Sequence, residues 1–237
     1  MITANDGARQ PPRAALTDRP IRFGMQGRAI RAARELRALR VAMLTPAPRW
    51  GAPQPMLFAH ALPLGAFDGS VDLEHWTPLL RGFFDLSVHA RGRYTRDGWS
   101  VQRPDDVDRI TNVFWHGGTE RCWALEHWRH RPIGTPRSVI AGQTASHEIG
   151  LFFRKSLQWM RCVGIDAPIA LLLSAVNVTR VRLAATAGDT AAMTPGFDRR
   201  IVLVPGEFVA ADPTAARLGI DTLLNGLWQA AGWQGRP

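Results

Sequence analysis

Four side chains with metal-binding chemistry lie close together in the middle of the chain: His116, Cys122, His127 and His130. Thiolate sulfur and imidazole nitrogen are the usual ligands of zinc. Geometry argues against a zinc site, because an extended chain places Cys122 and His130 about 26 Å apart, at about 3.3 Å per residue. His127 would then point to the opposite face, and only a turn after Glu126 would bring the ligands together. We therefore expect no metal site and no cofactor.

Asp105, Asp106 and Asp108 form an acidic cluster after Pro104 that would suit a divalent ion if a distant Glu joined it. Turn and capping roles explain these residues more simply. The chain has no Gly-rich dinucleotide or phosphate-loop motif, no H-E-x-x-H and no G-x-S-x-G, and Lys155 is its single lysine. We therefore predict no catalytic residue, and an enzymatic activity is disfavoured without being excluded.

Cations and aromatic rings alternate around a predicted hairpin tip. The residues concerned are His89, Arg91, Arg93, Tyr94, Arg96 and Trp99. Such mixtures bind single-stranded nucleic acid by stacking and phosphate contact. A solvated loop with one amphipathic Tyr94 and one buried Trp99 fits the same residues, so both interpretations stay open.

A second basic stretch lies near the N-terminus. The net charge is +9, and residues 1–50 carry ten arginines against three acidic residues. The five regularly spaced arginines are Arg28, Arg31, Arg34, Arg37 and Arg40. They lie opposite an apolar stripe of Ala29, Ala32, Ala33, Leu36, Leu39 and Met43 and drift around the helix, since three residues turn it by about 300°. This stretch is either an interface for nucleic acid or an acidic partner, or the solvated side of a docking helix.

Arginine is the better bidentate ligand for phosphate, but arginine-heavy usage also follows from GC-rich coding. Two cysteines cannot form a disulfide framework, and the first residues lack the layout of a secretion signal. The longest apolar stretch, 167–178, is shorter than the roughly 20 residues that span a bilayer. We therefore expect a cytoplasmic protein with no membrane helix.

The patterns divide the chain into a disordered tail (1–22), an Arg-rich amphipathic helix with a Pro-rich linker (23–50), and one α+β domain (51–237). The first helix is predicted over 25–44 and the first strand over 56–64. The pairs Asp97-Gly98 and Gly117-Gly118 predict two-residue hairpins.

The second hairpin can be given a register, because a Gly117-Gly118 loop pairs Phe114 with Arg121 and Asn112 with Trp123. Cys122 then shares a face with Val113. Both faces carry apolar residues, which indicates a hairpin covered on both sides.

A helix over 146–163 is expected to bury Ile149, Phe152, Phe153, Leu157 and Met160, and to end at Gly164. Strands follow over 169–173, 178–183 and 201–204, the last ended by Pro205-Gly206. A closing helix is capped by Asp212 and buries a face made of Ile220, Leu223, Leu224, Leu227, Trp228 and Ala231. The predicted class is α+β, a mixed or antiparallel sheet with hairpins, covered by two or three helices, plus the Arg-rich N-terminal helix.

Several of these segments resemble the C-terminal region of bacterial Schlafen-like AlbA-domain proteins. The likeness is carried by the segments 168–174, 178–183, 198–205 and 227–232, and with less force by 110–126 and 58–67. It implies an accessory module without a defined activity of its own. The acidic and lysine-bearing signature of the AlbA domain, which is assigned to DNA binding, has no equivalent here, so the resemblance assigns no DNA-binding residue.

The leading hypothesis is a non-catalytic bacterial interaction module that associates with nucleic acid, or with a nucleic-acid-binding protein, through the Arg-rich arm. The alternative is a metal-independent RNA-processing endonuclease whose candidates are His89, Arg93, His116 and His127. A third possibility is a split or decayed part of a larger protein.

Overall fold

The structure is a computed structural model. It describes residues 23–44, 54–65, 91–96, 98–102, 109–114, 117–128, 139–165, 168–186, 189, 195–209 and 212–237. The acidic cluster at 105–108, the tail 1–22 and most of the Pro-rich linker lie outside these residues.

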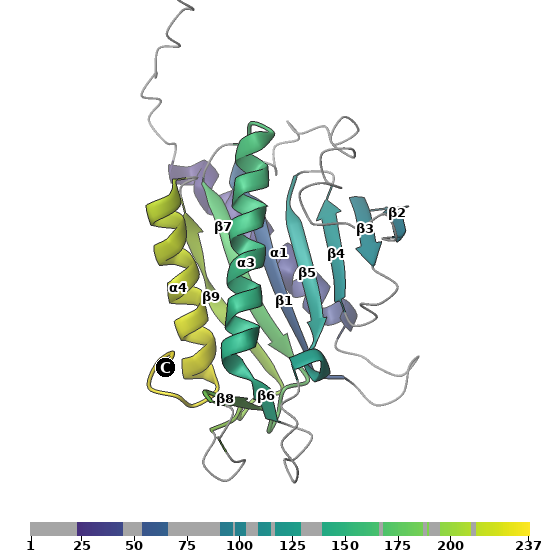
Figure 1. Cartoon of the computed structure of the whole chain (residues 1–237). Coiled ribbons are helices and arrows are strands. Elements are labelled where there is room, and N and C mark those ends of the chain that lie inside the picture. Colours follow the sequence, from purple (N-terminus) through teal and green to yellow (C-terminus); the bar gives the residue numbers. More distant parts are fainter. Residues whose placement is uncertain are drawn as a thin grey trace, which may run out of the picture.

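A seven-stranded antiparallel sheet organises the fold, with strand order β2-β3-β4-β5-β1-β7-β9 (Figure 1). Its strands are β1 (Met56–Pro63), β2 (Arg91–Thr95), β3 (Gly98–Gln102), β4 (Arg109–Phe114), β5 (Thr119–Ala124), β7 (Ile169–Val176) and β9 (Ile201–Val209). A small second sheet pairs β6 (Val139–Ala141) with β8 (Arg182–Ala184) in parallel. With helices over the large sheet, the predicted α+β class is confirmed.

Two long helices, α3 (Gly142–Cys162) and α4 (Pro213–Ala230), lie side by side over one face of the sheet (Figure 1). The apolar residues predicted to face inward from both helices are all buried. Asp212 caps α4 by accepting hydrogen bonds from the backbone N–H groups of Thr214 and Ala215. Gly164 and Gly232 follow the two helices with positive φ. These predictions are confirmed.

The opposite face is covered by α1 (Phe23–Leu44), which lies behind the sheet in the view of Figure 1. Ala33 of α1 packs with Leu62, Ala170 and Leu172 of the central strands. The strands therefore have apolar residues on both faces, and every residue of β7 is buried.

The β4–β5 hairpin was predicted in the wrong register. Asn112 pairs with Glu120 instead of Trp123, and Ile110 pairs with Cys122. β4 ends at Phe114, whose backbone N–H donates to the carbonyl of Gly118, so the connection is longer than two residues. The predicted pairing differs from the observed one by an odd number of residues. Because side chains alternate between the two faces of a strand, this error assigns the side chains of one strand to the wrong face of the sheet. A β2–β3 hairpin forms where one was predicted, but its loop lies one residue earlier than Asp97-Gly98, because Gly98 begins β3 and pairs with Thr95. Trp99 is buried.

Two strand predictions near the C-terminus are also corrected. Only Arg182 and Leu183 of the segment 178–183 belong to a strand, β8, because Arg180 has a φ of 67° in a turn. β9 continues through Pro205-Gly206, where its register with β7 shifts between Leu171 and Leu173. A β-bulge on the outermost strand accommodates proline, which has no N–H to donate.

A 3-10 helix, η2 (Leu125–Trp128), follows β5. Among the described helices none is long and apolar enough to cross a membrane.

Candidate functional site

The arginines of α1 divide into an exposed group and an inward group. Arg28, Arg31 and Arg34 are exposed, whereas Arg37 is buried and Arg40 is half-buried. Each three-residue step turns the helix by about 300°, so the third step places Arg37 about 180° from Arg28. The same drift exposes Leu39, which was predicted to face inward and is 62% exposed.

Arg37 is held against the backbone of β9, one of the two edge strands of the sheet. Its Nη1 donates to the carbonyl oxygen of Val204 at 3.0 Å. Burial, and then the charge of Arg34, lower the pKa of Arg37. The prediction that Arg37 and Arg40 lie with the other arginines on the solvent side of the helix is therefore wrong, because both have partners in the sheet.

Arg40 reaches a buried carboxylate on β5. Its Nε donates to Oε2 of Glu120 at 2.7 Å and its Nη2 donates to Oε1 at 2.6 Å, a bidentate pair. The imidazole Nε2 of His60, on β1, lies 2.8 Å from Oε2. Asn112 Nδ2 and Cys122 Sγ donate to Oε1, the latter at 3.6 Å. We call these five residues, from α1 and three adjacent strands, the Glu120 cluster.

Ionisation of Glu120 depends on these donors. Burial by itself would raise the pKa of the carboxyl group, but the hydrogen bonds and charges of His60 and Arg40 lower it well below its usual range. Burial, and then the neighbouring carboxylate, raise the pKa of the Cys122 thiol well above its ordinary value. The thiol is therefore no nucleophile at neutral pH, and the cluster acts as an anchor that fixes α1 to the sheet.

The site predicted around the β2–β3 hairpin lies at the β2 edge of the sheet. Arg93, Tyr94 and Arg96 are exposed on β2 and its turn, and Tyr94 is 66% exposed. The side chains of Arg91 and His89 lie outside the described residues. Since β2 is the edge strand at the other end of the sheet from β9 and is separated from β1 by β3, β4 and β5, the hairpin site and the α1 arginines belong to different parts of the fold.

The proposed zinc ligands and endonuclease candidates are not brought together where the structure describes them. Cys122 lies against Glu120 on the α1 side of the sheet, whereas His127 in η2 lies 3.8 Å from Glu148 of α3. Arg93 is separated from β5 by β3 and β4, a distance of about 14 Å at about 4.8 Å per strand. His116 and His130 lie outside the described residues.

His60, Asn112 and Glu120 were not singled out by sequence reasoning. The available signal was a histidine in the middle of the apolar strand 56–64, since a polar residue in a buried strand requires a partner. A second signal is the pairing of Asn112 with Glu120 across the β4–β5 hairpin. The incorrect register hid this pairing, because it placed Asn112 opposite Trp123.

Comparison of the chain with family models, curated proteins and solved structures finds no match. The resemblance to the Schlafen-like AlbA region stays a prediction.

Proposed function

We propose that this chain is a non-catalytic interaction module that binds nucleic acid through the exposed arginines of α1. The observation that carries the proposal is the division of the arginines. Arg37 and Arg40 fix the helix to the sheet, and Arg28, Arg31 and Arg34 extend from the anchored helix into solvent.

Anchoring matters because a binding surface that is already ordered loses less conformational entropy when it meets its partner. The three exposed arginines advance by about 9 Å along the helix axis and by about 120° around it. They therefore present a short positive surface with bidentate donors suited to phosphates. A surface of this kind binds the phosphate backbone of a nucleic acid and does not recognise its base sequence.

The experiment is a titration of labelled single-stranded and double-stranded DNA and RNA over a range of salt concentrations. The variant R28Q/R31Q/R34Q removes the exposed charges without touching the anchoring residues. If each arginine neutralises one phosphate, the salt slope of log K falls by about 2 to 3 in this variant, since each contact contributes about 0.7 to 0.9.

A variant with the same net charge, R180Q/R199Q/R200Q, is the matched control, because these exposed arginines lie outside α1, next to β8 and β9. An equal loss of affinity in the control would refute the assignment to α1. Absence of binding at low salt to all four nucleic acids would refute nucleic-acid binding and leave a protein as the partner of α1.

A further inference from the structure

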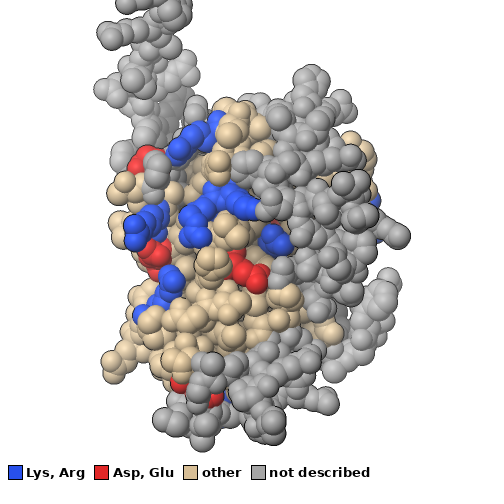
Figure 2. Space-filling model, viewed as in Figure 1, with Lys and Arg blue, Asp and Glu red and all other residues tan. Residues whose placement is uncertain are grey.

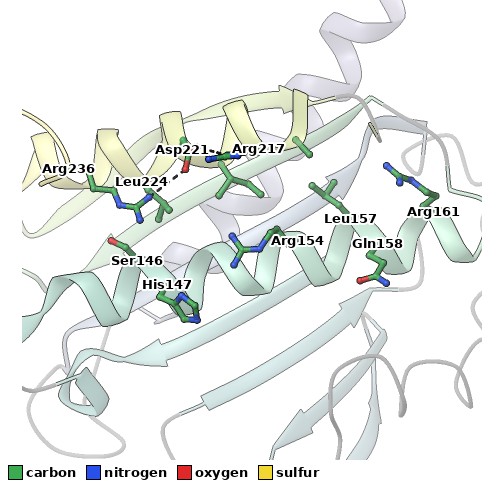
Figure 3. Close-up of a pocket in the computed structure, with 12 residues that line it drawn as sticks. Ser146, His147, Arg154, Leu157, Gln158, Arg161, Arg217, Asp221, Leu224 and Arg236 are labelled. Carbon is green, nitrogen blue, oxygen red and sulfur yellow. Dashed lines mark hydrogen bonds and ion pairs between the residues drawn. The ribbon is translucent and has the colours of Figure 1, made fainter. Parts of the chain in front are cut away.

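A pocket of about 600 Å³ lies between α3 and α4, on the face of the sheet opposite to α1 (Figure 3). Arg154 and Arg161 reach it from α3, and Arg217 and Arg236 reach it from α4 and the C-terminal segment. Figure 2 shows Lys and Arg side chains gathered over this same face of the molecule. We call this pocket the α3–α4 groove.

The floor of the groove is apolar. Leu157, Ile220 and Leu224 line it and are 5%, 2% and 2% exposed. A Cβ at position 150 would lie 3.1 Å from Nη1 of Arg154 and 3.7 Å from Cδ1 of Leu224. Glycine at this position therefore leaves room for the Arg154 guanidinium beside the apolar floor.

The charges around the groove are unbalanced. Asp221 is shared by Arg217, at 3.8 Å, and Arg236, at 3.5 Å. Arg154 and Arg161 form no ion pair with any residue in the part of the chain that the structure describes. The groove therefore has four guanidinium groups and one carboxylate. This leaves an excess of three positive charges next to the apolar floor.

We propose that the α3–α4 groove binds a phosphate-bearing ligand of nucleotide size, with the phosphate between the arginines and the apolar part on the floor. The guanidinium fork matches phosphate oxygens in a bidentate manner. A phosphate ester carries close to two negative charges at neutral pH, which balances the excess better than one carboxylate does. The volume lies within the range of about 300 to 1,000 Å³ that small-molecule sites occupy.

This site is independent of the proposed function of α1, because the sheet separates the two surfaces. The same ligand chemistry has two sources, a free nucleotide and the phosphorylated 5′ end of a strand. Both place a terminal phosphate next to a base, and the groove as described accepts either.

The test is calorimetric titration of the full chain at low salt. The probes are inorganic phosphate, a nucleoside, the corresponding nucleoside monophosphate, and a trinucleotide with and without its 5′ phosphate. We expect the monophosphate to bind more tightly than inorganic phosphate, and the nucleoside not to bind. Preference for the monophosphate over the phosphorylated trinucleotide identifies a free nucleotide, and the reverse order identifies a strand end.

The variant R154Q/R161Q should weaken binding of the monophosphate by at least about tenfold, because two charge-assisted contacts are lost. Both side chains are exposed, so its melting temperature should equal that of the wild type or exceed it. R28Q/R31Q/R34Q should keep the affinity for the monophosphate, which separates this proposal from the function of α1.

Three results would each overturn the proposal. They are equal affinity for nucleoside and monophosphate, unchanged affinity in R154Q/R161Q, and no binding of any phosphorylated probe below about 1 mM.

Discussion

Replacing Glu120 by glutamine tests whether the buried carboxylate anchors α1. Oε1 accepts from Arg40 Nη2, Asn112 and Cys122, and Oε2 accepts from Arg40 Nε and His60. In glutamine, an NH₂ group replaces one of these two oxygens. In either orientation its NH₂ faces a nitrogen of Arg40, which cannot accept, so E120Q loses at least one hydrogen bond of the bidentate pair as well as the charge.

The size of the effect follows from burial. Hydrogen bonds to charged groups contribute about 1.5 to 3 kcal/mol each, and removal of one partner of a buried ion pair costs about 3 to 5 kcal/mol. The Glu120 side chain is fully buried and that of Arg40 is 17% exposed, so the guanidinium partly regains water. We therefore expect E120Q to cost about 3 kcal/mol, a large part of a typical stability of about 5 to 15 kcal/mol.

The assay is urea unfolding followed by tryptophan fluorescence, since Trp123 is buried on the same strand as Glu120. The matched control is E35Q, which removes an exposed carboxylate from α1. Thermal unfolding should shift by about 6 to 12 °C, at about 2 to 4 °C per kcal/mol for a chain of this size. Hydrogen exchange should become faster in α1 if the anchor is lost.

The pH dependence has a defined sign. The lowered pKa of Glu120 means that its contribution is fully present above the unfolded pKa, about 4.3, and is lost as pH falls through the lower folded value. The difference in stability between wild type and E120Q should therefore be constant above about pH 5 and shrink in stronger acid.

A double-mutant cycle built from R40M, E120M and R40M/E120M isolates the ion pair. The double variant R40M/E120M should cost less than the two single changes together, because neither charge is then left buried without its partner. A cost for E120Q below about 1 kcal/mol, equal to that of E35Q, would refute the anchoring argument, since it lies within the range of surface substitutions.

Two further predictions concern side chains outside α1. Cys162 is exposed and Cys122 is buried with a raised thiol pKa, so a thiol reagent should label one cysteine rapidly in the native protein, and C162S should abolish that fast phase. Rapid labelling of C162S would contradict the described burial of Cys122. D212A removes the cap of α4 and should cost about 1 kcal/mol in urea unfolding, compared with little effect for the exposed control D198A. Equal stability of these two variants would show that the cap contributes nothing.

The elements that the sequence predicted well are those with a long local pattern. α4 has a capping residue, a run of apolar residues at helical spacing and a glycine stop, and the structure confirms all three. α3 buries the five residues expected of it. Such signals are contained within about twenty residues, so they do not depend on distant parts of the chain.

The Glu120 cluster could not be predicted in the same way. Its members are 80 residues apart in the case of Arg40 and Glu120, and 60 residues apart in the case of His60 and Glu120. Their meeting requires the order of β1, β4 and β5 in the sheet and the correct hairpin register. A register error by an odd number of residues placed Asn112 and Glu120 on opposite faces of the sheet, because side chains alternate along a strand.

By itself, the sequence determined the α+β class, most of the helices and strands, and the concentration of arginine near the N-terminus. Only the tertiary structure decided which arginines are free to bind a partner. Helical periodicity turns Arg37 and Arg40 away from Arg28, but it does not say which side of the helix meets the sheet. That choice depends on a carbonyl of Val204 and a carboxylate of Glu120, which the fold brings beneath α1 from distant strands.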